Sequence, residues 1–375
     1  MTTSPPLRVA MVATRAFPSV GGIETHISEV APRLADAGVD VTVVTTDPGW
    51  RLPARETIKG ARLWRFRGWP AKADYSFAPG IYRAITHGGW DLVHCQGYQT
   101  LTAPLAMRAA ATARLPYLVT LHSGSHSSSI RNALMRIQWK ALHWRLLHAE
   151  RVIAVSDFEA AFFSEKLRLP AEHFVIIPNG SNLPPVAPPP PSDQGPLIVS
   201  VGRLERYKGH QRVLAALPRV LQRFPQARLR IAGAGPENHR LRRMAAELGV
   251  ADRVEIGPIP SRDRRGMACL LSQAALVTLL SDYESQGIAV HEALSLRRPV
   301  LVAYTSALCE LADRSMVSAV SQHASDDEVA NAIIRQLRHP RLPPAVRLPT
   351  WDECASSLLA LYHSIAGRPV RELAS

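Results

Sequence analysis

Residues 274–303 read AALVTLLSDYESQGIAVHEALSLRRPVLVA, a strand, a helix and a second strand in succession. Ala274–Leu280 and Pro299–Ala303 are apolar runs of strand length, and Gly287–Leu296 between them is long enough for a helix. Strands joined by a helix pair in parallel, and parallel sheets bind ligands beyond the carboxyl ends of their strands. The polar residues that follow Leu280 therefore predict a binding site at that edge.

The same alternation of strands and helices runs through both halves of the chain. In the C-terminal half we expect further strands at Leu197–Val201, Ala227–Ala232 and Arg253–Ile256, with helices at His210–Phe224 and Pro236–Leu248. In the N-terminal half we expect a helix at Glu24–Ala37 and strands at Leu7–Ala13, Val39–Thr45, Asp91–His94, Tyr117–Leu121, Arg151–Val155 and Phe174–Ile177. The pattern predicts an α/β protein with two doubly wound, Rossmann-like domains.

A proline-rich stretch at 182–196 separates the two halves and cannot form a helix or a central strand. We interpret it as a linker between an N-terminal domain (1–181) and a C-terminal domain (197–349). The tail, 350–375, contains a helical pattern at Trp351–Ile365. We expect this helix to cross back and pack on the N-terminal domain.

Composition favours a globular protein and leaves its partners open. The chain has 375 residues, a net charge of +13 and four scattered cysteines, none in a CxxC pair. No apolar run reaches the ~20 residues of a membrane-spanning helix, so we expect a cytoplasmic protein. The positive charge attracts phosphates, nucleic acid or anionic lipid alike. A nucleic-acid-binding protein is a remote alternative, because no helix-turn-helix, aromatic strand platform or clustered basic run occurs.

Two loops at expected strand ends carry the residues suited to a ligand. Gly202-Arg203 and Lys208 follow the strand at Leu197–Val201, and a guanidinium fork with an ammonium group suits a diphosphate. Glu284 and Glu292 flank Gly287 at the next helix start, where carboxylates can accept hydrogen bonds from hydroxyls and backbone amides can meet phosphate. Each loop alone is also compatible with an ordinary solvated surface.

The spacing Glu284-x7-Glu292, within Glu-x-x-Gly-Ile-x-x-x-Glu-Ala and followed by Pro299-Val300, resembles the retaining glycosyltransferases of family 4. These enzymes have the GT-B fold, in which two Rossmann-like domains face each other across a cleft. Further matching segments are Gly21-Gly22-Ile23-Glu24, His94, Thr120-Leu121-His122, Val152–Ser156, Ile177–Gly180, Gly202-Arg203 with Lys208-Gly209, Gly233–Pro236 and Trp351.

The resemblance implies that residues 1–181 form the acceptor-side domain and residues 197–349 the nucleotide-sugar-binding domain. It also implies a role for each matched residue. Arg203 and Lys208 would hold the donor diphosphate, Glu292 the ribose, and Glu284 the transferred sugar. His122 would lie beside the anomeric carbon. Other donor contacts would come from Gly21, Gly22, Gly202, Gly287 and Ile288, with Ile259 near the base. For the acceptor, loops of the first half offer Tyr98, His126 and Arg131 as candidates.

The implied reaction is transfer of a hexose from a nucleotide sugar to a hydroxyl acceptor by front-face displacement. The acceptor class stays open among a glycan, a lipid-linked glycan, a phosphoinositol-type lipid and a specialised metabolite. Since no Asp-x-Asp motif occurs, we expect no metal. We also expect no cofactor, because the nucleotide sugar is itself a substrate. The alternative within the fold is another GT-B enzyme, such as a nucleotide-sugar epimerase.

Three positions depart from the family pattern. Ser285 and Gln286 stand where a glycine and an aromatic residue are usual, and Arg297 where a glycine often ends the helix. A turn at Arg297 must therefore differ in geometry or be strained.

Ile130–His148 reads as an amphipathic helix with one apolar face that includes Trp144, and with Trp139 among basic residues on the other face. The basic face is either a solvated surface or a contact with anionic lipid at the inner face of the membrane.

Overall fold

The computed structural model describes residues 5–19, 21–70, 77–98, 100–122, 139–187, 195–260 and 263–367. Over these residues the chain divides into two compact units. The first comprises the described residues up to 122, those from 139 to 180, and those from 350 onward. The second comprises the described residues from 181 to 349.

The first unit is built on a sheet of eight strands among the described residues, in the order β3-β4-β2-β1-β5-β6-β7-β8. The strands pair in parallel except for β3, which is antiparallel to β4. The strands are β1 (Arg8–Ala13), β2 (Asp40–Thr46), β3 (Arg55–Ile58), β4 (Ala61–Phe66), β5 (Leu92–Gln96), β6 (Tyr117–Thr120), β7 (Arg151–Ala154) and β8 (Phe174–Ile176). Central strands are almost wholly buried because helices cover both faces.

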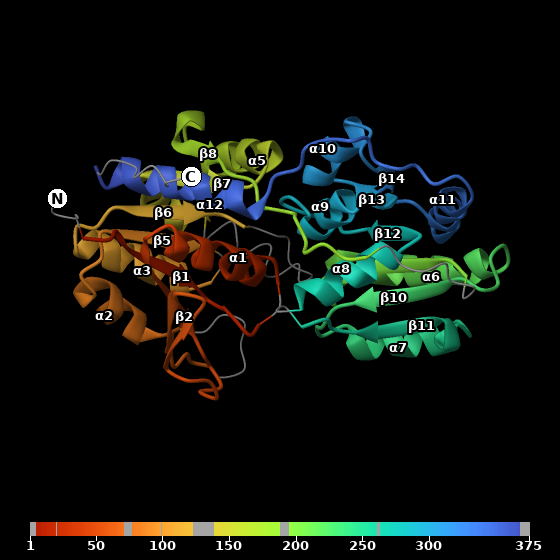
Figure 1. The fold of residues 1–375 in the computed structure, drawn as a ribbon, viewed down its shortest axis with the longest axis horizontal. Helices are drawn as coiled ribbons and strands as arrows, with labels where there is room; N and C mark the ends of the chain where they lie inside the picture. Colours follow the sequence, from red (N-terminus) through yellow and green to blue (C-terminus); the bar gives the residue numbers. More distant parts are fainter. Residues whose placement is uncertain are drawn as a thin grey trace. The chain divides into compact units, whose positions relative to one another are not determined.

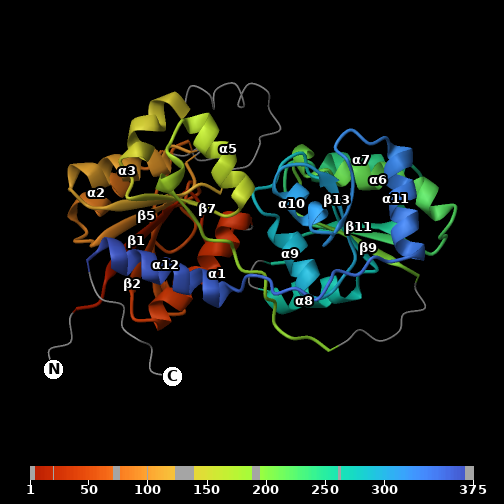
Figure 2. The same ribbon diagram turned by 90° about the horizontal axis from the view of Figure 1, so that it is seen from above.

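Helices of the first unit lie on the two faces of this sheet. Figure 2 shows α1 and α12 on one side and α2, α3 and α5 on the other. Their bounds are α1 (Gly22–Asp36), α2 (Pro79–His87), α3 (Thr102–Thr112), α5 (Asp157–Leu167) and α12 (Trp351–Ile365), and residues 139–147 are also helical. A short 3-10 turn, η1 (Ala171–His173), precedes β8.

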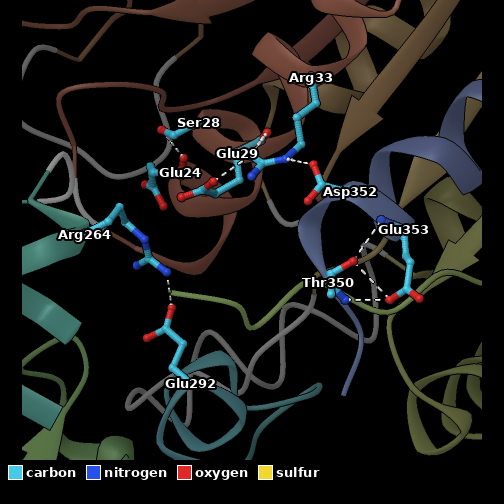
Figure 3. A network of polar contacts seen from close by, with 9 residues as sticks. All are labelled: Glu24, Ser28, Glu29, Arg33, Arg264, Glu292, Thr350, Asp352 and Glu353. Carbon is cyan, nitrogen blue, oxygen red and sulfur yellow. Dashed lines mark hydrogen bonds and ion pairs between the residues drawn. The ribbon is translucent and has the colours of Figure 1, made fainter. Parts of the chain in front are cut away.

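The last helix, α12, packs on α1 although the two are far apart in sequence (Figure 1). It begins with a capping box in which Thr350 and Glu353 satisfy each other's backbone amides. Its Trp351 and Tyr362 are fully buried, and Asp352 pairs with Arg33 of α1 at 2.8 Å (Figure 3). The tail therefore completes the core of the first unit.

The second unit has a parallel sheet of six strands among its described residues, in the order β11-β10-β9-β12-β13-β14. These are β9 (Leu197–Val201), β10 (Arg228–Ala232), β11 (Val254–Gly257), β12 (Leu276–Leu279), β13 (Val300–Tyr304) and β14 (Ser318–Ser321). The helices are α6 (His210–Leu221), α7 (Asn238–Glu247), α8 (Arg264–Gln273), α9 (Ile288–Ser295), α10 (Ala307–Asp313) and α11 (Asp326–Arg338), with 3-10 turns η2 (Arg206–Lys208) and η3 (Ala251–Arg253).

Two apolar cores flank the second sheet, and its strands contribute side chains to both. Ile198 of β9 packs with residues of α6, α7 and α11, whereas its neighbour Val199 packs with residues of α8, α9 and α10. This alternation is what a strand covered on both faces requires, since successive side chains point in opposite directions. The doubly wound α/β fold predicted from the sequence is confirmed in each unit.

One prediction about side-chain orientation is wrong. The structure describes residues 139–148 of the helix expected at Ile130–His148. In this part, Trp139 and Trp144 lie on the faces opposite to those expected. Trp139 packs inward, donating from its indole to the Tyr98 hydroxyl at 3.0 Å, whereas Trp144 is 67% exposed. Leu142 and Leu146 are the buried residues of this face, so the true apolar stripe follows Trp139.

Candidate functional site

The centre of the site in the second unit is an ion pair between Lys208 and Glu284. Lys208 Nζ lies 2.7 Å from Glu284 Oε1, and the side chains are only 17% and 10% exposed. Ser281 Oγ donates to the same carboxylate oxygen at 2.7 Å. Burial alone would lower the pKa of Lys208, but the Glu284 carboxylate outweighs it and the pKa is raised. Lys208 is therefore charged near neutral pH, with the Glu284 carboxylate as its ion-pair partner.

The chain geometry around Glu284 fixes its position. The Glu284 amide donates to Ser306 Oγ at 2.8 Å, and the Ala307 amide donates to the Glu284 carbonyl at 3.2 Å. Ser306 itself has a left-handed backbone, with φ of 47°. Because few residues other than glycine adopt this conformation, the loop before α10 is held by these contacts.

The loop after β9 places Arg203 and Lys208 at the carboxyl end of that strand. His210, at the start of α6, is 1% exposed, and its Nδ1 forms a hydrogen bond with Ser200 Oγ at 2.8 Å. Its Nε2 lies 3.1 Å from the Arg203 carbonyl, an acceptor, so Nε2 carries the proton. Burial lowers the pKa of His210 to about 4, so the ring that anchors Arg203 is neutral.

Glycine at 209 is required for this loop to close. It has a φ of 74°, and a Cβ there would lie 2.0 Å from the Leu280 carbonyl oxygen. Arg203 is 38% exposed and pairs with Glu205 at 3.2 Å. The Glu205 side chain is only 11% exposed, whereas the Arg203 side chain remains partly open to solvent and so accessible to a ligand.

Glu292, predicted to bind ribose, is buried in α9 and pairs with Arg264, the first residue of α8 (Figure 3). Their side chains are 4% and 18% exposed. Asp263 caps α8 by accepting a hydrogen bond from the Gly266 amide at 2.7 Å, which fixes the start of the helix and with it the position of Arg264. The two glutamates of the motif thus lie in two separate ion pairs rather than in one cluster.

The start and the end of α9 both use left-handed residues. Gly287, the residue before Ile288, has a φ of 79°. Arg297, just after the helix, has a φ of 54°, and the Arg298 amide donates to Ala293 O at 2.9 Å. The helix therefore ends with the left-handed geometry that suits glycine, and of the two outcomes expected at Arg297 the strained one is found.

Two further donor-site predictions lie at strand ends of the second unit. Gly202 follows β9, and its amide donates to Ala232 O at 3.1 Å. Ile259 follows β11, is partly buried and packs against the α8 and α9 core. Their contacts with a donor stay predictions.

The predicted residues of the first unit lie at the carboxyl ends of β1, β5 and β6. Gly21 precedes α1 and Gly22 begins it, and a Cβ added at Gly22 would meet nothing within 4 Å. His122, with a φ of 44°, places its Nε2 2.7 Å from Gln96 Oε1. Burial lowers the pKa of His122 well below its usual value, and so do the neighbouring imidazoles His26 and His94.

Of the three acceptor candidates, the structure describes Tyr98 alone. Tyr98 is 0% exposed and packs edge-on against Phe163, so it belongs to the core of the first unit. A ligand cannot reach a side chain at this depth without rearrangement of the core. His126 and Arg131 lie outside the described residues.

Comparison with known proteins follows the same division of the chain. The family model "Glycosyltransferase Family 4" matches residues 20–183, and "Glycosyl transferases group 1" matches residues 187–347. A GDP-mannose:cellobiosyl-diphosphopolyprenol alpha-mannosyltransferase from Xanthomonas oryzae is 31% identical over 77% of this chain and 76% of that protein. The chain belongs to glycosyltransferase family 4. This confirms the resemblance drawn from the glutamate motif.

A second relative of this family 4 glycosyltransferase is the phosphatidyl-myo-inositol mannosyltransferase of Mycobacterium tuberculosis, 27% identical over 96% of this chain and 98% of that protein. Among solved structures, sucrose-phosphate synthase from Thermosynechococcus elongatus has a TM-score of 0.72 at 21% identity, covering 96% of both chains. HepE from Anabaena, in complex with UDP and glucose, has a TM-score of 0.70 at 18% identity, covering 96% of this chain and 95% of that chain. The GT-B fold is therefore established.

Several residues of this glycosyltransferase that position the site were missed in the sequence. They are Ser281, Ser306, His210, Arg264 and Gln96. Ser281 lies next to the strand end and three residues before Glu284, so its position offered a signal. The others gave none, because their partners are distant in sequence or are backbone groups.

Proposed function

We propose that this glycosyltransferase moves a hexose, with mannose as the first candidate, from a nucleotide diphosphate sugar to a hydroxyl of a lipid-linked acceptor. The Lys208–Glu284–Ser281 cluster is the observation that carries the proposal. It combines a buried cation for a phosphate with a buried carboxylate for sugar hydroxyls. The mannosyl donor and the lipid-linked acceptor are suggested by the names of the Xanthomonas and mycobacterial relatives.

The reaction we propose retains the configuration of the sugar. The bond between the anomeric carbon and the donor phosphate oxygen breaks, and the acceptor oxygen forms its bond on the same face. The departing phosphate oxygen takes the proton of the acceptor hydroxyl. Arg203 and Lys208 stabilise the negative charge on the leaving diphosphate, while Glu284 and Glu292 orient the sugar and ribose through their hydroxyls.

We also propose that transfer needs no metal. The described residues contain no group of three or more histidines, cysteines, aspartates or glutamates arranged to hold a metal ion. The supporting argument is chemical, because two protein cations at the diphosphate can supply the charge that a divalent ion supplies elsewhere.

The decisive experiment incubates the protein with GDP-mannose, UDP-glucose and related donors, with and without a polyprenol-diphosphate glycan or phosphatidylinositol. Nucleotide release that depends on the acceptor supports transfer, whereas an isomerised sugar without release supports the epimerase alternative. Proton NMR of the product reports the anomeric configuration, and inversion would refute retention. Complete loss of turnover in excess chelator, restored by magnesium or manganese, would refute metal independence.

Paired variants test the cluster itself. Lys208→Met should abolish acceptor-dependent release, whereas Lys166→Met should not, because Lys166 lies in an exposed pair with Glu165. Equal activity of the two variants would remove Lys208 from the donor site.

Exposed apolar side chains at one edge of the first sheet support a lipid-linked acceptor. The loops after β2 and β4, which are parallel neighbours, carry Trp50, Leu52, Trp69 and Phe77, and Trp69 is 76% exposed. The loop after β2 is ordered by Asp47, whose carboxylate accepts from two backbone amides at 2.8 Å. Arg51 and Arg67 of the same two loops are exposed. Exposed aromatic residues beside arginines are typical of surfaces that contact anionic lipid.

We therefore propose a cytoplasmic enzyme that docks on the inner face of the membrane through this edge. No helix in the described part of the chain is long and apolar enough to span a membrane. Flotation with anionic vesicles should be reduced in Trp50→Ala/Trp69→Ala, while Trp144→Ala tests the alternative surface on residues 139–148. Equal flotation with neutral and anionic vesicles at low salt would remove the membrane proposal.

A further inference from the structure

Three imidazoles gather behind the carboxyl edge of the first sheet, each from a different element. His26 comes from α1, His94 from β5, and His122 from the residues after β6. The rings of His26 and His122 meet edge to face, with centroids 4.7 Å apart. His94 lies between the Tyr362 hydroxyl of α12, at 2.6 Å, and Thr120 Oγ1, at 2.7 Å.

All three rings are neutral at physiological pH. Burial lowers the pKa of His26 to about 4 and that of His94 to about 3. The pKa of His122 lies well below its usual value, through burial first and then through His26 and His94. Among the residues that the structure describes, His26 and His94 are the titratable groups that shift the pKa of His122.

The proton of the neutral His122 ring is located by Gln96. Gln96 Oε1 lies 2.7 Å from His122 Nε2, and an amide oxygen can only accept, so Nε2 carries the hydrogen. The Gln96 amide nitrogen is in turn within 3.2 Å of both ring nitrogens of His94. Since Gln96 is 3% exposed and His94 is held from two sides, the orientation of the amide is fixed by the core.

We propose that Gln96 is a positioning residue for His122: it fixes a neutral imidazole in the Nε2–H tautomer, so that Nδ1 is presented as a hydrogen-bond acceptor and never as a cation. The inference rests on the proposed function and on the place that the family resemblance implies for His122, beside the anomeric carbon of the donor sugar. A neutral acceptor can orient a sugar hydroxyl there. An imidazolium would instead repel the positive charge that develops at the anomeric carbon.

The tautomer can be tested without any activity. In nitrogen-15 NMR spectra of the whole protein, assigned by comparison with His122→Ala, we expect His122 Nε2 to be protonated and Nδ1 to be unprotonated between pH 6 and 8. The reverse tautomer, or titration of the ring in this range, would overturn the inference. This readout stands even if the protein transfers no sugar, so failure of the proposed function is recognised separately.

Kinetics test whether Gln96 acts through His122. Gln96→Leu should lower kcat, with the donor KM unchanged. We expect a loss of about 10-fold to 100-fold, by analogy with the loss when an outer partner of a metal-bound imidazole is removed. Adding Gln96→Leu to His122→Ala should cause no further loss. If the two losses multiply instead, Gln96 has only a structural role and the inference fails.

Gln96→Glu gives a readout that a structural role would not produce. The new carboxylate should raise the pKa of His122, so that activity falls on the acidic side of neutrality and recovers as the pH rises. Tyr362→Phe is the matched control, since it removes a partner of His94 and leaves the Gln96–His122 contact in place. A Gln96→Glu profile identical to that of Tyr362→Phe would overturn the inference.

Discussion

Removing the cation at Lys208 should destabilise the second unit as well as abolish donor binding. Lys208→Met leaves the Glu284 carboxylate mostly buried, with the Ser281 hydroxyl still 2.7 Å away but without its counter-charge. Breaking a buried ion pair from one side costs about 3 kcal/mol. Because about 1 kcal/mol shifts the Tm of a domain of this size by roughly 2–4 °C, we expect a fall of roughly 6–12 °C.

The double variant Lys208→Met/Glu284→Gln separates this electrostatic penalty from any loss of packing. A neutral amide needs no counter-charge, so the double variant should recover most of the lost Tm while remaining unable to bind donor. Thermal unfolding followed by circular dichroism and donor titration by calorimetry measure the two effects. If the single and double variants lose the same Tm, the carboxylate does not depend on Lys208 and the reasoning is refuted.

Three further predictions concern strain, burial and pH. Arg297→Gly should raise the Tm, because a left-handed residue other than glycine costs about 1 kcal/mol, whereas Arg297→Ala should not; equal Tm values would show no strain. Tyr362→Phe removes a hydrogen-bond partner of buried His94, so denaturant titrations should show a loss of about 1–3 kcal/mol in the free energy of unfolding. Tyr82→Phe is the control and should lose much less, because the Tyr82 hydroxyl is exposed. The free energy of unfolding should fall as the pH drops from about 6.5 towards 4, by about 1.4 kcal/mol per pH unit for each of His26 and His210. In this range the two imidazoles are protonated in the unfolded chain but stay neutral in the native state. A Tm that is constant or rises as the pH falls from 7 to 5 would contradict this pH dependence.

The sheet strands were predictable wherever both faces are buried. Leu197–Val201 coincides with β9, since an uninterrupted apolar run between a linker and a loop has few other interpretations. β3 and β4 were not predicted, because charged residues break their pattern. Arg65 of β4 is 3% exposed, with two backbone carbonyls and Glu56 as its partners. Such compensation is invisible in the sequence, where an arginine indicates exposure.

The helix around Trp139 shows a similar limit. A helical wheel fixes which residues share a face but not which face packs, and the apolar count favoured the side with Trp144. The structure places Trp139 against Tyr98 because the indole nitrogen finds the tyrosine hydroxyl there, 3.0 Å away. A polar atom within an aromatic side chain decided the orientation, and hydropathy alone carries no such information.

Residue types in the site were predictable, but their pairing was not. Lys208 and Glu284 were each recognised at a strand end, yet only the parallel neighbours β9 and β12 bring residues 76 positions apart within 2.7 Å. Arg264 gave no signal, because it is one of many arginines in a chain with 44 basic residues. Its partner Glu292 was assigned from the motif, and the motif does not include α8.

The pairing changes how the two predicted phosphate ligands should share their task. Lys208 is committed to Glu284 in a mostly buried pair, so its charge is already balanced before a diphosphate arrives. Arg203 is 38% exposed and makes a 3.2 Å contact with Glu205, whose side chain is 11% exposed, so the arginine remains accessible to a ligand. A guanidinium also offers two parallel donors to phosphate oxygens, which an ammonium group does not. Arg203 should therefore make the main contacts with the diphosphate. Lys208 should position Glu284 to bind the sugar hydroxyls, and its positive charge should help to stabilise the leaving group.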